Sequence, residues 1–478
     1  MRTILFFDDW PFLTHQNVRR RWFQAEPWPG LEPATDPSLA FSYGSPTVIR
    51  EPDGRWRMWA MGIQDLSKGD AGSGTYLYKS RDGLNWERDP HGEATGKPAS
   101  APEQHRVFKG EKSAVGAMPF RDEREPDPRR RYKLAYSDNG ETVNGVCGVC
   151  RIAVSPDGVH WEIDRQAVWR KQHTDTMFSI AWNPYTRKYQ FTGRPVLLDR
   201  RVALYQTSDW KTFDEPLIVE HPDPSDPDLI EFYGMPHFHY EGYFVGFLWK
   251  MWGAPKDLYG TTRMMGVVDS ELTYSINGIA WNRTNRQPLL KEESGPGWGA
   301  QYPASLIADD EGWLRIYTAS CRGEHADHGK LPKGTPAVQL TVSRLRKDGF
   351  CAMETRSGTG TITTRNFIPH GGPLTINAET RLCGAVRAEL RGLDNAALPG
   401  FELSACVPII GNHRDATLRW ISAGKTLETL DTLQGKPIRI HFELDEARLY
   451  AFRINADILF GQVPATDLAG HFIPNTII

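Results

Sequence analysis

The heptapeptide Ser80-Arg81-Asp82-Gly83-Leu84-Asn85-Trp86 decides how this 478-residue sequence is interpreted. It follows a strand-like run, Thr75-Tyr76-Leu77-Tyr78. Asp and Gly adopt the backbone conformations of tight turns at little steric cost, and the Trp supplies a large apolar ring that can pack where the chain returns. The segment therefore predicts a β-hairpin.

The same hairpin motif recurs along the first 350 residues, at intervals of roughly fifty to seventy-five residues. A unit that returns in this way is the mark of a repeat architecture. The further copies are Ser155-Pro156-Asp157-Gly158-Val159-His160-Trp161, Ser275-Ile276-Asn277-Gly278-Ile279-Ala280-Trp281, a shortened Ser208-Asp209-Trp210-Lys211-Thr212-Phe213, and a degraded Ser343-Arg344-Leu345-Arg346-Lys347-Asp348-Gly349-Phe350.

Two strand patterns keep phase with the hairpin. A strand such as Arg55-Trp56-Arg57-Met58-Trp59 precedes each copy, and a run rich in small residues, such as Ser113-Ala114-Val115-Gly116-Ala117-Met118, precedes that strand. Small residues suit an inner strand that is crowded about an axis. Five repeats therefore predict a five-bladed β-propeller over residues 1–350. The alternative is a long array of β-sandwiches whose turns coincide by chance.

The repeat stops after Phe350. Residues 351–478 hold strand candidates such as Ile438-Arg439-Ile440-His441-Phe442-Glu443-Leu444, separated by turns of Gly, Pro and Asp, and they show no long helical pattern. This part predicts a β-sandwich, jelly-roll-like, packed rigidly on the propeller. The expected fold class is all-β.

Composition and charge exclude several classes of partner. The formal net charge of -3 gives no electrostatic basis for binding nucleic acid or an anionic membrane, and no apolar run approaches the length of a membrane span. The N-terminal segment turns acidic at Asp8, so a cytoplasmic location is expected. Cys147 and Cys150 form a CxxC within a strand-like run, which favours buried small side chains over a metal or redox role. No cofactor is expected.

The candidate site is the funnel where the inner strands of a propeller begin. Carboxylates precede three inner strands, at Glu111, Asp175 and Glu231, and Asp9 joins them if the first strand enters there. Two carboxylates are the requirement for glycoside cleavage, one to protonate the leaving oxygen and one to act as nucleophile or to activate water. Aromatic side chains that can stack on a sugar ring lie nearby, at Tyr233, Trp298 and Tyr302.

Arg194 and His325 are two further candidates for the pocket. Arg194 either binds a substrate hydroxyl or carboxylate or pairs with Asp175. His325 is expected to line the pocket; the alternatives are a metal site with His173 and a solvated loop. Structural roles remain open for the acids as well, since Asp175 can cap a turn and Asp9 can pair with an arginine such as those at 19–21.

Five blades, a trailing β-sandwich and rim carboxylates in this order resemble the clan of glycoside hydrolase families 32, 43 and 68. The start Leu5-Phe6-Phe7-Asp8-Asp9 and the run Thr174-Asp175-Thr176-Met177-Phe178 also resemble a bacterial group described as family 32-like. The resemblance implies Asp175 as the middle Asp, Glu231 as the general acid and Asp9 as the nucleophile or base. Family 32 carries an Asn-Asp-Pro-Asn-Gly-type motif on its first inner strand, whereas Gly44-Ser45-Pro46-Thr47-Val48 carries no carboxylate here.

The expected function is a glycoside hydrolase or transglycosidase that acts on a small glycoside. The alternatives are a non-hydrolytic carbohydrate-binding propeller and a metal-dependent sugar lyase or epimerase. A small carbohydrate is the expected partner, and self-association is left open.

Overall fold

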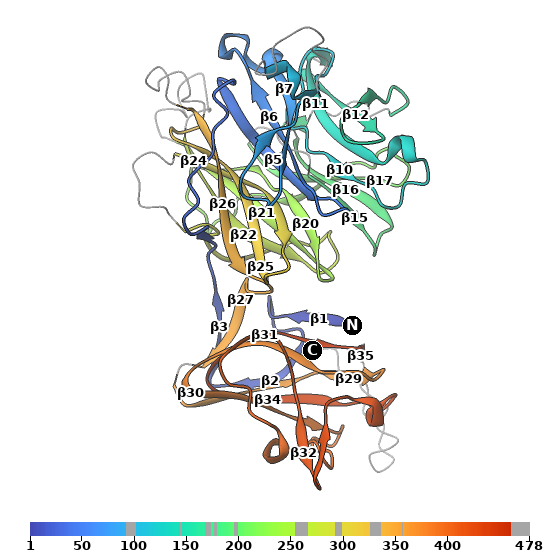
Figure 1. Ribbon diagram of the computed structural model, residues 1–478, viewed down its shortest axis with the longest axis vertical. Helices are drawn as coiled ribbons and strands as arrows, with labels where there is room; N and C mark the ends of the chain where they lie inside the picture. Colours follow the sequence, from blue (N-terminus) through green and yellow to red (C-terminus); the bar gives the residue numbers. More distant parts are fainter. Residues whose placement is uncertain are drawn as a thin grey trace. The chain divides into compact units, whose positions relative to one another are not determined.

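The computed structural model describes residues 1–91, 102–143, 146–167, 174–175, 179–195, 199–253, 266–291, 299–325, 336–355 and 357–459. Over these residues the chain is all-β, with strands, turns and short 3-10 segments and no α-helix, which confirms the expected fold class (Figure 1).

The chain forms two compact units. The central unit comprises Gln24–Leu345, and the terminal unit combines Met1–Phe23 with Arg346–Ile478. The division therefore falls five residues before the expected position at 350, and residues 1–23 belong with the C-terminal part of the chain rather than with the repeats.

The first strand explains this difference. Strand β1 (Arg2–Leu5) pairs antiparallel with β34 (Arg439–Ile454), so it does not enter the repeats. In the same sheet β2 (Phe12–Gln16) pairs with β28 (Thr359–Thr364), and β3 (Val18–Trp22) pairs with β27 (Cys351–Thr355). The other strands of the terminal unit are β29 (Asn366–Pro369), β30 (Thr375–Arg391), β31 (Asn412–Thr417), β32 (Trp420–Ser422), β33 (Lys425–Leu427) and β35 (Ala456–Leu459).

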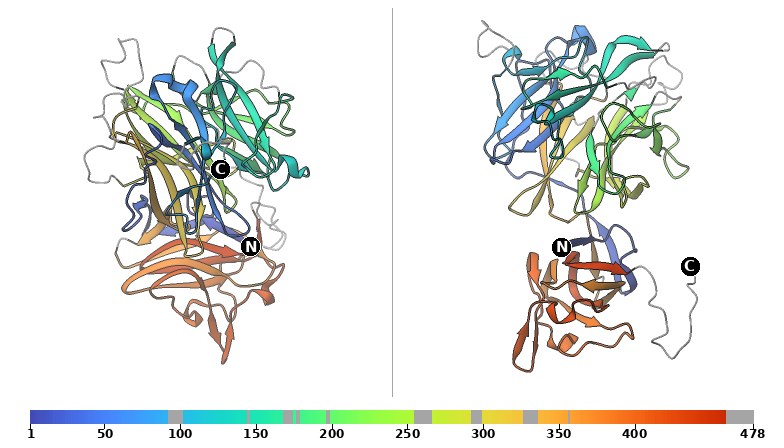
Figure 2. Two further views of the ribbon diagram at one scale, coloured as in Figure 1. Left: turned by 45° about the horizontal axis from the view of Figure 1, so that its top comes forward. Right: turned by 90° about the vertical axis from the view of Figure 1, so that its right-hand side faces the viewer.

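The first three sheets of the central unit are short antiparallel meanders, drawn in separate colours in Figure 2. The first sheet contains β5 (Phe41–Arg50), β6 (Trp56–Ile63), β7 (Ser73–Ser80), β8 (Glu87–Arg88) and β9 (Arg106–Phe108). The second contains β10 (Phe120–Arg121), β11 (Tyr132–Val143), β12 (Val146–Ser155) and β13 (Glu162–Ile163). The third contains β14 (Thr174–Asp175), β15 (Ile180–Asn183), β16 (Lys188–Pro195), β17 (Val202–Thr207) and β18 (Leu217–Glu220).

The fourth sheet has two antiparallel halves. A parallel pair, Val268 with Ala300, and a parallel bridge between Ala25 and Leu290 join them. The first half contains β19 (Ile230–Gly234), β20 (His237–Tyr240), β21 (Tyr243–Gly253), β22 (Gly266–Ser275) and β23 (Asn282–Pro288). The second contains β24 (Ala300–Ala308), β25 (Trp313–Cys321), β26 (Val338–Arg346) and β4 (Glu26–Pro27).

The hairpin motif forms the same hydrogen bonds in each of its copies in the central unit. Ser80 Oγ accepts from the N–H of Gly83 at 2.9 Å, and Asp82 Oδ1 accepts from the N–H groups of Leu84 and Asn85 at 2.8 and 2.9 Å. Gly83 has φ of +73°, a conformation that favours glycine because it has no Cβ. The side chains therefore build the turn themselves, with Ser155 and Asp157, and Ser275 and Asn277, in the corresponding places.

The shortened copy begins one residue earlier than the sequence suggests. Thr207 Oγ1 accepts from the N–H of Trp210 at 2.9 Å, and Asp209 fills the aspartate position. Trp210 thus stands where the other copies have glycine, with φ of +62°. Its buried ring packs among Ala135 and Cys150 of the second sheet, and this packing holds the conformation.

Each of these hairpins docks on another sheet: the later ones on the sheet that precedes them in the chain, and the first on the second half of the fourth sheet. Arg57 Nη1 donates to the carbonyl of Asp157 at 2.6 Å, and Trp59 Nε1 donates to that of Gly158 at 2.7 Å. The hairpin is thus a connector between successive sheets. Corresponding bonds join Arg315 and Tyr317 to Asp82 and Gly83, and Asn183 and Gln190 to Asn277 and Gly278.

The degraded fifth copy does not share this role. Asp348 and Gly349 belong to the terminal unit, where the buried Asp348 carboxylate pairs with Arg453. The outer edge of the last sheet is completed by a segment from early in the chain, because β4 pairs with β26.

A cavity of about 280 Å³ lies where one strand from each sheet or half-sheet meets. Its lining includes Thr47, Phe120, Ile180, His237 and Ala304, which come from the first, second and third sheets and the two halves of the fourth. These strands therefore surround a common space.

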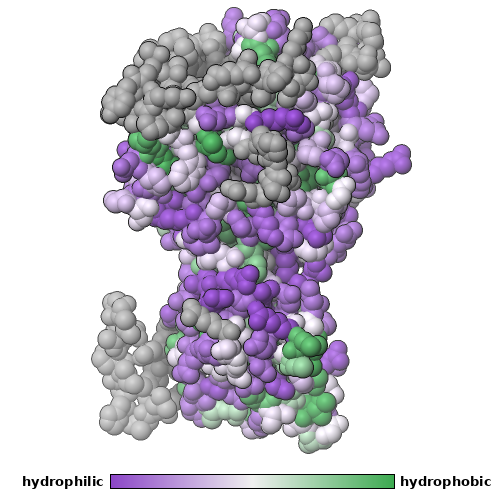
Figure 3. All heavy atoms as spheres, turned by 90° about the vertical axis from the view of Figure 1, so that its left-hand side faces the viewer, coloured by the Kyte–Doolittle hydropathy of each residue, from purple (hydrophilic) through white to green (hydrophobic). Residues whose placement is uncertain are grey.

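Hydrophilic residues predominate on the face shown in Figure 3, and hydrophobic residues form small separate groups there. The described residues include no helix long and apolar enough to span a membrane.

Candidate active site

Strand β19 carries the centre of the candidate site. Its burial alternates, with Ile230 and Phe232 buried on one face and Glu231 and Tyr233 half-buried on the other. This alternation is the period-two pattern of a strand whose two faces meet different surroundings. Phe232 packs with Val202, Met235 and Leu248, so Glu231 and Tyr233 are presented on the opposite face.

Glu231 forms an ion pair with Arg200, and both side chains are largely buried, with exposed fractions of 16% and 15%. Arg200 follows β16 and precedes β17, and its carbonyl accepts from the N–H of Phe232 at 3.1 Å. The backbone of one sheet thus holds the neighbouring strand at the position where the two side chains pair.

Tyr233 lies between two guanidinium groups. The Cζ of Arg194 lies 4.5 Å from the centroid of its ring, and that of Arg200 lies 5.9 Å away. A cation over an aromatic face is attracted by the ring quadrupole. Arg194 is buried on β16, and its cross-strand partner on β14 is Asp175. The backbone pairing therefore sets Asp175 beside the arginine that covers Tyr233.

Aromatic rings from the fourth sheet complete the site. The ring of Tyr233 lies 4.6 Å from that of His325, 5.9 Å from that of Tyr302 and 6.5 Å from that of Trp249, between centroids. Trp249 comes from β21, Tyr302 from β24, and His325 follows β25. The half-sheets thus meet at a wall of stacked and tilted rings.

Tyr302 and His325 form a short hydrogen bond, 2.7 Å between the phenol oxygen and Nδ1. Burial raises the pKa of Tyr302 well above its ordinary value, so the phenol keeps its proton. A protonated phenol can donate to Nδ1 or accept from it, and the tautomer of His325 decides which of the two occurs.

Asp9 lies elsewhere. It belongs to the terminal unit, on the turn between β1 and β2, and its exposed carboxylate pairs with Arg20. This is the alternative in which Asp9 pairs with one of the arginines at 19–21. The residues described around Glu231 all belong to the central unit.

Glu111 contacts two arginines. Its carboxylate accepts from Arg165, which follows β13, at 2.6 Å and from Arg151 on β12 at 3.3 Å. The hydrogen bond from Arg165 and the charge of Arg151 lower the pKa of Glu111. The loop that carries it is held by Asp138, whose buried carboxylate accepts from three successive N–H groups, those of Glu111, Lys112 and Ser113, at 2.9 Å each.

The structure thus brings together Glu231, Tyr233, Tyr302, His325 and Arg194 of the expected residues, with the Asp175 backbone beside them. Trp298 and His173 lie outside the described residues. Among the residues that are described, no three His, Cys, Asp or Glu side chains are grouped as metal ligands would be.

Arg200 and Trp249 were not expected from the sequence. In an antiparallel meander, the connection between the second and third strands lies at the same end as the start of the first strand. The segment Asp199-Arg200-Arg201 belongs to such a connection, between β16 and β17. Extending the search from the residues before inner strands to these connections finds Arg200.

No family model and no curated protein matches the chain. Similar solved structures include a Bombyx mori family 32 β-fructofuranosidase, with 11% identity over 90% of this chain and 95% of that chain and a TM-score of 0.44. A thermostable family 43 glycoside hydrolase shares 13% identity over 66% and 94%, with a TM-score of 0.41. A Bacteroides ovatus glycosyl hydrolase shares 10% identity over 67% of this chain and 94% of that chain, with a TM-score of 0.46. The families in these names are two of those that the sequence resembles, but similarity at this level transfers neither an activity nor a residue role.

Proposed function

We propose that the central unit is a five-bladed β-propeller whose blades are the first three sheets and the two halves of the fourth. The support is the cavity that one strand of each blade lines, the successive docking of the hairpins, and the pairing of β4 with β26 that brings the start of the unit into the last blade. The terminal unit is proposed to be the jelly-roll-like β-sandwich.

The central unit is then a glycoside hydrolase or transglycosidase with its site around Glu231. The observation that carries this proposal is the convergence of Glu231 and Tyr233 with Arg194, the cross-strand partner of Asp175. Two acidic positions and an aromatic face at the same end of the inner strands are what a glycosidase uses to cleave the bond and hold the sugar.

The roles follow from the proton that the reaction needs. Glu231 protonates the leaving oxygen, and Asp175 attacks the anomeric carbon or activates the water that does so. Glu231 forms a salt bridge with Arg200. This pair must open before the carboxyl can take up a proton and donate it to the leaving oxygen. In the tautomer whose Nδ1 accepts from Tyr302, His325 carries an N–H on Nε2 that can donate to a sugar hydroxyl.

A non-hydrolytic carbohydrate-binding propeller is the second candidate. Two observations favour it. The first inner strand, Gly44-Ser45-Pro46-Thr47-Val48, carries no carboxylate, and the carboxylate of Glu231 is already paired with Arg200. In this case the arginines and rings hold a sugar without cleaving it.

One experiment separates the two candidates. The protein is incubated with a panel of aryl glycosides and fructans, and binding of the corresponding free sugars is measured by calorimetry. Hydrolysis that Asp175→Asn and Glu231→Gln abolish, while Glu26→Gln leaves it intact, supports the glycosidase; Glu26 is paired with Lys291 at 2.6 Å on β4. Sugar binding without turnover supports the binding protein.

A further inference from the structure

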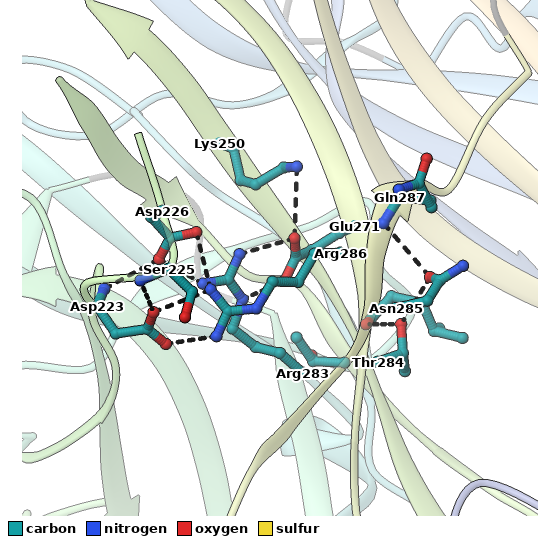
Figure 4. Close-up of polar contacts among 12 residues, drawn as sticks. Asp223, Ser225, Asp226, Lys250, Glu271, Arg283, Thr284, Asn285, Arg286 and Gln287 are labelled. Atoms are coloured by element: carbon teal, nitrogen blue, oxygen red, sulfur yellow. Dashed lines mark hydrogen bonds and ion pairs between the residues drawn. The ribbon is translucent and has the colours of Figure 1, made fainter. Parts of the chain in front are cut away.

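A buried ionic cluster lies on the face of β19 opposite to the site. We use the name ionic cluster for Lys250, Glu271, Arg283, Arg286, Asp223 and Asp226, shown in Figure 4. The side chains of Arg283, Glu271 and Asp226 are only 8%, 0% and 4% exposed. These three side chains lie in the interior, whereas Arg286 and Asp223 lie at the edge of the cluster and are each 32% exposed.

Arg283 joins three parts of the chain. Its Nη2 and Nε donate to both oxygens of Glu271 on β22, the former at 2.8 Å, and its Nη1 donates to Asp226 Oδ2 at 2.5 Å. Its Cζ also lies 4.9 Å from the centroid of the Phe232 ring. One guanidinium thus contacts β22, the connection before β19, and β19 itself.

The connection that Arg283 holds leads directly into the site. Asp226 closes a turn, because its Oδ2 accepts from the N–H of Asp223 at 2.9 Å and its own N–H donates to the Asp223 carbonyl at 2.8 Å. Arg286 also pairs with Asp223. Ile230, which begins β19, follows four residues after Asp226, so a fixed turn fixes where the strand starts.

Phe232 links the cluster to the reactive residues. It stands between Glu231 and Tyr233, and successive side chains of a strand point to opposite faces. If a smaller side chain replaced Arg283, Phe232 could shift into the space that the guanidinium fills. This shift would carry Glu231 away from Arg200 and Tyr233 away from Arg194. A misplacement of about 1 Å at a catalytic group can cost about 10²-fold in rate.

Stability alone gives a poor reason for such a cluster. Replacing buried ion pairs by apolar residues of similar volume is often neutral or stabilising, because desolvation offsets the attraction of the charges. The guanidinium offers geometry that an apolar side chain lacks, since its planar fork fixes two carboxylates at once.

We propose that Arg283 is a positioning residue, which acts from behind β19 to hold Glu231 and Tyr233 in register with Arg200 and Arg194. The expected effect on kcat/KM rests on the proposed glycosidase function. The expected effect on hydrogen exchange rests only on the structure of β19. It needs the fork of arginine, because a lysine can bind Asp226 or Glu271 but not both in the same way.

The test compares Arg283→Lys with Arg315→Lys in the full-length protein. Arg315 is a matched control, because it is equally buried, pairs with Asp309 at 2.9 Å and lies over the rings of Trp28 and Trp56 at 4.8 and 5.1 Å. Hydrogen exchange of residues 230–234 and kcat/KM are measured well below both melting temperatures.

Arg283→Lys is expected to raise hydrogen exchange of residues 230–234 about tenfold and to lower kcat/KM about 10²-fold. Arg315→Lys should leave both within about threefold of the unchanged protein. Combining Arg283→Lys with Arg200→Met should lower kcat/KM by less than the product of the single effects, because both act through Glu231.

Equal exchange and equal kcat/KM in the two lysine variants would overturn the proposal. If no glycoside is hydrolysed by the unchanged protein, the glycosidase function fails, and the hydrogen exchange of residues 230–234 still decides the role of Arg283.

Should Arg283→Lys lack a cooperative unfolding transition, Asp226→Asn serves in its place, since it keeps the hydrogen-bond acceptor and removes the charge. Raised exchange at 230–234 in that variant supports the proposal, and unchanged exchange refutes it.

Discussion

At the scale of single residues, the contact between Tyr302 and His325 bears on which nitrogen of the imidazole donates a hydrogen bond in the site. We infer that the phenol donates to Nδ1, since burial keeps it protonated. In that tautomer Nε2 of the neutral imidazole is the donor. The bond then gives the aromatic rings around Tyr233 a fixed donor.

Tyr302→Phe should separate this role from simple stability. The variant loses one buried hydrogen bond, at a cost of about 1 kcal/mol in the free energy of unfolding, and kcat/KM is expected to fall about tenfold as the tautomer is released. Tyr317→Phe is the control, because Tyr317 donates to the Gly83 carbonyl at 2.8 Å in a hairpin contact. Urea unfolding and kinetics check both; an equal fall in kcat/KM for the two variants would show that the tautomer does not matter.

The site could be predicted from the sequence where a residue stands at a fixed place in the repeat. Glu231, Tyr233 and Tyr302 follow from the rule that inner strands begin at the site. Arg200 does not, because the same rule ignores the other connection at that end. Asp9 was placed by its resemblance and its position near the N-terminus, but the pairing of β1 with β34, 430 or more residues away in the chain, is not visible in a local pattern.

At the scale of elements, the hairpins act as connectors between sheets. The repeat of Ser, Asp and Gly was enough to predict their turns, because the bonds are local. Their docking on another sheet was not predicted, since the donors, such as Arg57 and Trp59, are distant in sequence. Trp210 was misaligned for a related reason: the motif keeps its backbone conformation while the residue type changes.

Gly158→Ala should therefore cost more than a turn substitution alone. Gly158 has φ of +76°, and a Cβ there would lie 2.7 Å from Cζ2 of Trp59. Gly54 is the control, with φ of +87° and open space around the added atom. The expected loss in unfolding free energy is about 1 kcal/mol for Gly54→Ala and about 2–4 kcal/mol for Gly158→Ala. Equal losses in urea unfolding would contradict the docking contact.

Glu220, the last residue of β18, is expected to make the free energy of unfolding depend on pH. Burial, the largest cause, raises the pKa of Glu220 to about 8, with Arg283, Glu271, Arg286 and Asp223 as the charged groups around it. The folded protein then binds a proton between about pH 4.5 and 8 that the unfolded chain has lost. Stability should fall as the pH rises through this range and level off above it.

Glu220→Gln tests this dependence, because the amide mimics the neutral carboxyl. The variant should gain unfolding free energy over the unchanged protein on going from pH 5 to pH 9. Denaturant unfolding at both values provides the measurement. A difference between the two proteins that stays constant with pH would mean that Glu220 is not the group responsible.

At the scale of the whole molecule, the chain begins and ends in the same unit. Residues 1–23 supply β1, β2 and β3 to strands from beyond residue 350, and β4 then enters the last sheet of the central unit. The end of the repeat near residue 350 is visible in the sequence. The return of the N-terminal strands was not, because a strand carries no mark of which distant edge it will pair with.

Fragments should behave accordingly. Residues 24–345 contain each sheet of the central unit with β4 included, so this fragment is expected to unfold cooperatively on its own. Residues 346–478 alone leave the edges that β1, β2 and β3 cover unpaired, and should show no cooperative transition until a peptide of residues 1–23 is added. Cooperative unfolding of 346–478 without the peptide, followed by circular dichroism, would contradict this division.

The central claim is that Glu231 delivers the proton to a glycosidic oxygen. Its most direct measurement is the turnover of Glu231→Gln on two aryl glycosides of the same sugar, one with a poor leaving group and one with a highly activated one. A general acid contributes about 10²–10⁴-fold only where the leaving group needs a proton. The account predicts a loss of that size with the poor leaving group and little loss with the activated one, whereas Asp175→Asn should lose turnover on both. Full turnover of the poor substrate by Glu231→Gln would contradict it.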